Sequence, residues 1–128
     1  MDSKKIILYT SCLMLEIAKA DNNVKNEELI IIEEILIDYF RISKKYASEI
    51  LRASHKELEN SIDIFKYANF LNHELDYEDK VDLIRCIFEV GYSDGKLHYL
   101  ELHYIKIMSS LLNIENDDVV KAKLEKKN

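Results

Sequence analysis

The sequence predicts an all-α fold, and three observations lead to this prediction. The chain has 128 residues, of which 48% are apolar, enough for one domain over 1–128 with a sizeable core. It contains no proline and only two glycines, whereas a β-sandwich or barrel of this length needs many turn residues. Apolar residues recur with helical spacing and not in the alternation of half-buried strands. We therefore expect a compact bundle of about seven helices.

The expected helices can be placed in chain order. Their ranges are 4–20, 25–41, 44–54, 58–73, 77–92, 98–112 and 116–125. The second contains LIIIEEILIDYF, whose polar side chains recur along one face, so this helix should be nearly surrounded by protein. Ser43 is a candidate N-cap of the third helix and Asp76 of the fifth, where Asp79 adds a carboxylate to the first turn. Asn72 and His73 are expected to form the break before the fifth helix.

Composition also excludes several kinds of partner and site. The formal net charge is −6, which repels phosphate backbones, so we expect no nucleic-acid partner. The basic tail at 121–127 is interpreted as a solvated helix end. Cys12 and Cys86 form no CxxC pair, and each lies among apolar residues, so both are expected as buried thiols in the reducing cytoplasm.

The N-terminal segment has the outline of a signal peptide. MDSKKIILYTSCLMLEIAKA has a basic start, an apolar stretch and an A-x-A-like end at Ala18–Ala20. Glu16 interrupts the approach to that end, and the segment has a counterpart later in the chain. We therefore expect residues 1–20 to be retained. No apolar run approaches the roughly 20 residues that span a bilayer.

An internal repeat joins the two ends of the chain. EIAKADNNVKNEEL, residues 16–29, aligns with EVGYSDGKLHYLEL, residues 89–102, at a constant offset of 73. Downstream, FRIS at 40–43 resembles LNIE at 112–115 after a slip of one residue. Each copy predicts a helix, a short loop, a second helix and then a third. The matched pairs are Glu16 with Glu89, Ala18 with Gly91, Ala20 with Ser93, Asp21 with Asp94, Glu28 with Glu101 and Leu29 with Leu102.

Helix-end chemistry accounts for much of this repeated pattern, which we call the acidic corners, Asp21–Glu28 and Asp94–Glu101. Asn22 and Gly95 occupy the same place after the first helix, and both residue types accept a positive φ. If Lys25 and His98 are the N-caps, the glutamates Glu28 and Glu101 fall at N3, where a carboxylate can accept the N-cap amide. The same frame gives two hydrophobic staples, Val24 with Leu29 and Leu97 with Leu102. Lysine and histidine are poor caps, so Asp21 and Asp94 are expected to accept loop amides.

The corners resemble a known family. AKADNNVKNEE (18–28) and YSDGKLHYLE (92–101) are similar to the repeated motif of the TerB-like family of tellurite-resistance domains, and also to the N-terminal region of the co-chaperone DjlA. The resemblance implies an all-α fold of about seven helices in two related halves. It implies a non-catalytic interaction module, with other proteins of a bacterial stress-response assembly as partners and with peripheral association at the inner face of the membrane.

Two features depart from the family pattern. Asn22 stands where the family usually has glycine. The chain has no proline and therefore no His-Pro-Asp motif, which excludes J-domain co-chaperone activity by this chain alone.

A divalent cation is the alternative ligand of the corners. Asp21, Glu28, Asp94 and Glu101 are hard oxygen ligands suited to Ca²⁺ or Mg²⁺. Supporting charge is expected from Glu16, Glu27 and Glu89. The pattern is not an EF-hand, because its glutamate is the eighth residue of the motif and not the twelfth. A weak cation sensor or scaffold is therefore the second functional hypothesis, and no cofactor is required by the first.

Zinc binding and catalysis find no support in the sequence. His98 and His103 are five residues apart and do not share a helix face as an i, i+4 zinc pair does. The chain lacks a nucleophile elbow and a phosphate loop, so we expect no enzyme. Tyr92, Tyr99 and Tyr104 flank the second corner, and each is either an interface residue or a ring packed between helices. The oligomeric state is open.

Overall fold

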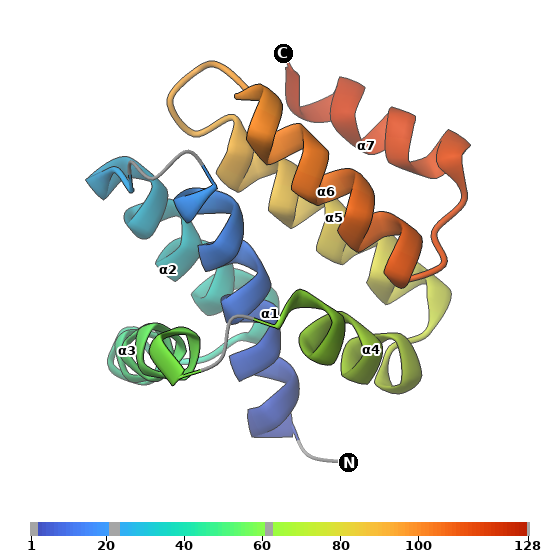
Figure 1. Ribbon diagram of the computed structural model, residues 1–128. Helices are drawn as coiled ribbons and strands as arrows, with labels where there is room; N and C mark the ends of the chain where they lie inside the picture. Colours follow the sequence, from blue (N-terminus) through green and yellow to red (C-terminus); the bar gives the residue numbers. More distant parts are fainter. Residues whose placement is uncertain (1–2, 21–23, 61–62, 128) are drawn as a thin grey trace.

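The computed structural model describes residues 3–20, 24–60 and 63–127. These residues form seven helices and no strand, which confirms the all-α prediction (Figure 1). The helices are α1 Ser3–Lys19, α2 Asn26–Phe40, α3 Lys44–Asn60, α4 Ile64–Glu74, α5 Tyr77–Gly91, α6 Tyr99–Leu111 and α7 Asn116–Lys127.

Helix α1 lies at the centre of the fold. It packs against α2, α3, α4, α5 and α6, whereas α7 packs mainly on α5. Apolar residues therefore surround α1 on nearly every side, as expected for a helix that neighbours enclose. Its fully buried residues include Cys12, Leu13, Met14, Leu15, Ile17 and Ala18. The apolar stretch with the outline of a signal peptide is thus the central helix of the core.

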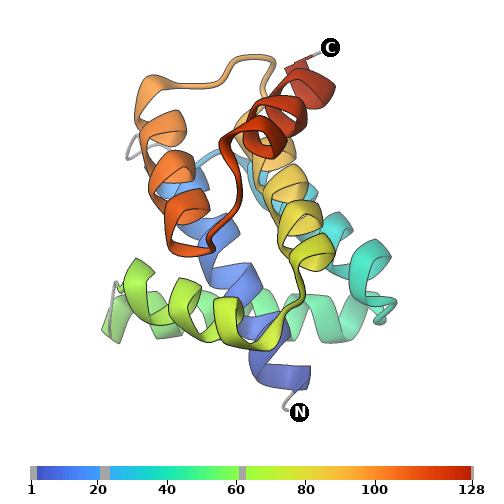
Figure 2. The same cartoon turned by 90° about the vertical axis from the view of Figure 1, so that its right-hand side faces the viewer.

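The two halves predicted from the repeat are present. α1, α2 and α3 form one half, α5, α6 and α7 form the other, and α4 connects them (Figures 1 and 2). α2 begins at Asn26 and α6 at Tyr99, so the offset of 73 is kept at the start of the second helix. The slip of one residue lies at the ends of α2 and α6. Arg41 and Asn113, which follow these ends and match after the slip, both take a left-handed conformation, with φ of 55° and 57°.

The boundary between the third and fourth helices was predicted wrongly. α3 does not stop at residue 54 but continues to Asn60, because Lys56 and Glu57 are good helix formers and Leu58 continues the buried stripe. α4 begins at Ile64 and not at 58, since Asp63 caps it by accepting the amide of Lys66 at 3.1 Å. Asn72 and His73 lie inside α4, so they do not form the break before α5.

Two predicted N-caps are confirmed. Ser43 Oγ accepts the amide of Tyr46 at 3.0 Å at the start of α3. Asp76 Oδ1 accepts the amide of Asp79 at 2.9 Å at the start of α5, and Asp79 lies in the first turn. Both caps satisfy a donor that has no partner within its own helix.

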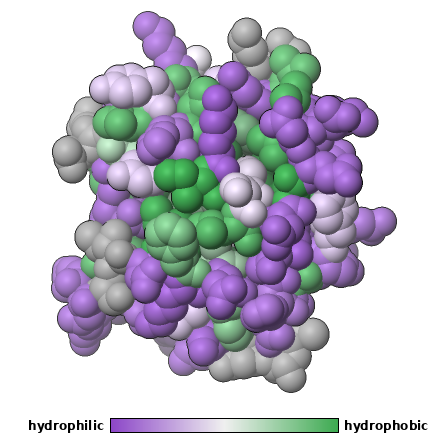
Figure 3. Space-filling model, turned by 45° about the vertical axis from the view of Figure 1, so that its right-hand side comes forward, coloured by the Kyte–Doolittle hydropathy of each residue, from purple (hydrophilic) through white to green (hydrophobic). Residues whose placement is uncertain are grey.

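Helix α2 is more exposed than its sequence predicted. It packs on α1, α3 and α5, but no neighbour covers the side chain of Ile30, which is 56% exposed, or all of Tyr39, which is 37% exposed. Apolar areas among charged side chains are also visible in the space-filling view (Figure 3). Within the described residues, no helix has both the length and the apolar character needed to cross a bilayer.

Leu13→Ala tests the central position of α1. Leu13 is fully buried, so truncation should lower the free energy of unfolding by about 3 kcal/mol, through lost burial and the cavity left behind. Leu124→Ala is the matched control, because Leu124 on α7 is 56% exposed and should cost less than about 0.5 kcal/mol. Urea denaturation measures both, and equal losses would contradict the central placement of α1.

Candidate functional site

The second corner has the backbone conformation that its sequence predicted. Gly95 has a φ of +92°, and its amide donates to the carbonyl of Tyr92 at 2.8 Å. Asp94 Oδ1 accepts the amide of Lys96 at 3.2 Å, which confirms its expected role in the loop. A Cβ at position 95 would meet no atom within 4 Å, so glycine is favoured there by the backbone angle and not by a lack of space.

The N3 glutamates cap both corners in the same way. Glu28 Oε1 accepts the amide of Lys25 at 3.0 Å, and Glu101 Oε1 accepts the amide of His98 at 2.8 Å. Each glutamate is only 4% exposed. His98 proves a better cap than expected, because its Nδ1 also accepts the amide of Leu100 at 3.2 Å. These bonds orient α2 and α6 relative to the loops before them.

Small residues allow the second loop to pack closely on α5. A Cβ at Gly91 would lie 2.6 Å from Leu97 Cδ1 and within 4 Å of Ile105 and Ile17. Gly91 therefore makes room for the loop leucine, and its counterpart Ala18 is fully buried in α1. The Oγ of Ser93 is buried and has no hydrogen-bond partner among the described residues.

The two corners meet. Lys25 Nζ donates to Asp94 Oδ2 in an ion pair that joins the start of α2 to the α5–α6 loop. About a third of each side chain stays exposed, 36% for Lys25 and 33% for Asp94. The hydrogen bond from Lys25 lowers the pKa of Asp94 below its ordinary value. Sequence reasoning gave Lys25 only a capping role and missed this pair, and Asp21 and Asn22 lie outside the described residues.

The supporting acidic residues do not gather around this pair. Glu16 is half-buried in α1, where burial raises its pKa, and Glu27 is exposed in the first turn of α2. Glu89 binds elsewhere, since its Oε1 accepts Lys126 Nζ of α7 at 3.2 Å. Across 3–20, 24–60 and 63–127, no three His, Cys, Asp or Glu side chains are arranged to hold a metal ion.

One aromatic side chain stands out at the corners. Tyr99, the first residue of α6, is 74% exposed, and its ring stacks on His98 with centroids 4.7 Å apart. Tyr92 and Tyr104 instead pack partly buried against the core, in agreement with the packing interpretation. Val24, just before the first N-cap, is 36% exposed. The paired corners therefore combine an ordered aromatic ring, an aliphatic side chain and a neutralised ion pair.

Comparison with known proteins identifies the family. Residues 8–124 match the family model described as tellurite resistance protein TerB. The chain belongs to the TerB family. A crystal structure of a protein of unknown function from Porphyromonas gingivalis W83 has a similar fold, with a TM-score of 0.73 at 21% identity, over 100% of this chain and 92% of that one. No curated protein matches the sequence.

The cysteines of this TerB domain are free thiols of low reactivity. Burial raises the pKa of Cys12 to about 12 and that of Cys86 to about 11. Both therefore stay protonated near neutral pH, and the thiol is a much weaker nucleophile than the thiolate. Cys12 lies in the core, whereas Cys86 is only partly covered.

The TerB corners can hold a divalent cation only by giving up present contacts. Glu28 and Glu101 each use one carboxylate oxygen on a backbone amide, and Asp94 is paired with Lys25. The cation hypothesis stays a prediction, and it now requires Asp94 to exchange an ammonium for a metal ion.

A double-mutant cycle on Lys25→Gln and Asp94→Asn measures the contact between the corners. We expect a coupling energy below about 1 kcal/mol at pH 7, because both side chains are partly exposed to solvent. Since the folded pKa of Asp94 is lowered, the coupling should be fully present above the unfolded value of about 3.9 and should disappear as the pH falls through the folded value. A coupling that persists in acid would exclude the ion pair.

Calcium or magnesium titration tests the cation hypothesis. A ligand that binds only the folded state stabilises it by RT ln(1 + [L]/Kd), so millimolar cation should raise the melting temperature of the wild type. Asp94→Asn should abolish the rise, whereas Asp117→Asn, an exposed control on α7, should retain it. Unchanged melting of the wild type would reject the hypothesis.

Proposed function

We propose that this TerB domain is a non-catalytic protein-interaction module in a bacterial stress response of the tellurite-resistance type. The proposed binding surface is the paired corners, centred on Tyr99, Val24 and the Lys25–Asp94 pair. The single observation that supports it best is the exposed Tyr99, whose ring stacks on His98 at the start of α6.

The chemistry of this surface suits a protein partner. Tyrosine offers a large apolar body with a polar tip, and such residues are enriched at the centres of interfaces. Stacking on His98 restricts the ring before binding, so less side-chain entropy is lost when a partner covers it. The Lys25–Asp94 pair lowers the net charge of the loops, which reduces the desolvation cost of covering them.

The proposal extends to the partners and the place of action. The partners are other proteins of a stress-response assembly, and the net charge of −6 opposes a nucleic-acid partner. The proposed location is the cytoplasm, where free thiols such as Cys12 and Cys86 persist, with peripheral association at the inner face of the membrane through those partners.

Site-specific photocrosslinking in the native host tests the proposal. A photoreactive phenylalanine derivative at Tyr99 should crosslink to a discrete protein, because this side chain is 74% exposed at the centre of the proposed surface. The same derivative at Phe65 is the matched control, since Phe65 is 65% exposed but lies on α4, away from the corners. Mass spectrometry identifies the products.

Two outcomes would count against the proposed surface. If both positions crosslinked to the same proteins, the crosslinks would reflect nonspecific contact with any exposed position. A product from Phe65 with none from Tyr99 would move the interface to α4. The expected result is a product from Tyr99 that Val24→Ser weakens, because Val24 belongs to the same surface.

A further inference from the structure

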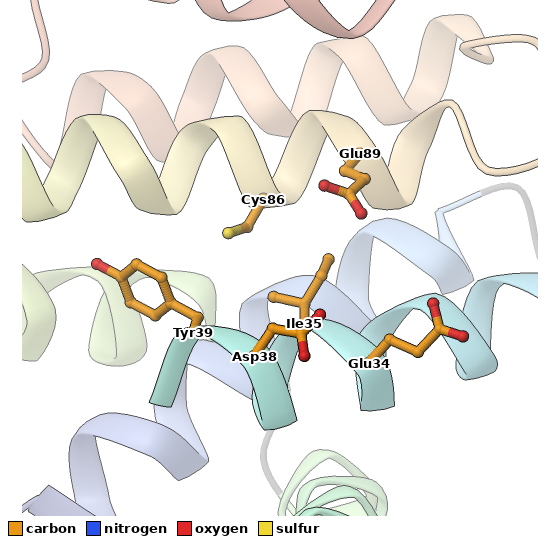
Figure 4. Close-up of a pocket in the computed structure, with 6 residues that line it drawn as sticks. All are labelled: Glu34, Ile35, Asp38, Tyr39, Cys86 and Glu89. Atoms are coloured by element: carbon orange, nitrogen blue, oxygen red, sulfur yellow. The ribbon is translucent and has the colours of Figure 1, made fainter. Parts of the chain in front are cut away.

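A groove between α2 and α5 has a composition that the proposed function does not use. Its volume is about 330 Å³, and it is lined by Glu34, Ile35, Asp38 and Tyr39 of α2 and by Cys86 and Glu89 of α5. Figure 4 shows Cys86 and Glu89 pointing from α5 toward α2, with Ile35 between the helices. Three carboxylates thus surround an apolar floor, and no basic side chain is among the lining residues.

A hydrogen bond links the two helices at one end of the groove. The hydroxyl of Tyr39 donates to Asp79 Oδ1 at 3.3 Å, which links the C-terminal end of α2 to the first turn of α5. Ile35 is buried beneath the groove, whereas Glu34 and Asp38 are exposed on its α2 side. The floor is therefore fixed by the core, and the acidic side chains on α2 remain accessible.

The chain itself shows which charge this lining attracts. Lys126 of α7 reaches Glu89 and donates its ammonium to Oε1 at 3.2 Å. A lysine therefore already binds one acidic side chain of the groove. Glu34 and Asp38, on the α2 side, are exposed to solvent and take part in none of the ion pairs among the described residues. Charge complementarity therefore favours a basic occupant.

A second copy of the chain fits poorly. A two-fold contact through this groove would bring the three carboxylates of one copy against the same three of the other, and like charges in contact cost several kcal/mol. An uncharged apolar occupant would cover Glu34 and Asp38 without neutralising them. A segment with lysine or arginine beside an apolar side chain satisfies both the acidic sides and the floor.

We propose that the α2–α5 groove binds a basic amphipathic segment of a partner protein, with an apolar side chain on Ile35 and Tyr39 and basic side chains on Glu34 and Asp38. This surface is separate from Tyr99 and Val24, so its failure and that of the corner surface can be distinguished. Glu89 is left unchanged in the test because it already binds Lys126.

The probe is a fluorescein-labelled helical peptide of leucine and lysine, compared with the same peptide carrying glutamate in place of lysine. Anisotropy should show that the wild type binds the lysine peptide and not the glutamate peptide. The double variant Glu34→Gln, Asp38→Asn should weaken binding about tenfold, since two exposed ion pairs are lost. Glu59→Gln, Asp117→Asn is the matched control: both are exposed, neither lines the groove, and the change in charge is identical.

A second readout locates the peptide. Cys86 lines the groove and is partly accessible, whereas Cys12 is fully buried, so N-ethylmaleimide should modify Cys86 first. The lysine peptide should slow this modification in the wild type and in the control variant, but not in the groove variant. Mass spectrometry assigns the modified cysteine.

Three results would overturn the proposal. Equal weakening by the groove and control variants would mean that the peptide senses only net charge. Tight binding without protection of Cys86 would place the peptide elsewhere. No binding at low ionic strength, where such contacts are strongest, would remove the groove as a site for basic segments.

Discussion

The fold depends on two buried carboxylates that hold the backbone at equivalent points of the two halves. Glu28 and Glu101 accept the amides of Lys25 and His98, and so fix the direction in which α2 and α6 leave their loops. A buried carboxylate is stable only with such partners. With both corners fixed in this way, the loop of the second half lies within reach of Lys25. Helix α1 of the first half packs against α2 and α3 of its own half and against α5 and α6 of the other.

The two corners are similar in backbone but different in surface chemistry. Lys25 binds across to Asp94, whereas its counterpart His98 caps its own helix and stacks on Tyr99. The repeat thus supplies the same frame twice, and the differences within it produce one surface that is both ordered and partly apolar. The interaction that we propose for this TerB domain depends on this difference between its two corners.

Local chemistry made much of this structure predictable from the sequence. The caps at Ser43 and Asp76 and the N3 glutamates depend on residues within one turn of each other. The helix count follows from the spacing of apolar residues along each segment. The Lys25–Asp94 pair spans 69 positions, so no local pattern could reveal it. The apolar pattern of α2 likewise predicted a helix nearly surrounded by protein. It could not show that Ile30 would be left 56% exposed, because that depends on where the other helices pack. The groove with α5 was unpredictable for the same reason.

Native-state amide hydrogen exchange tests the central role of the two carboxylates most directly, because it reports on each capped amide separately. The account predicts that the amides of Lys25 and His98 are both protected, that Glu28→Ala removes protection at Lys25 alone, and that Glu101→Ala removes it at His98 alone. Free exchange of both amides in the wild type, or protection that survives the loss of its own glutamate, would contradict it.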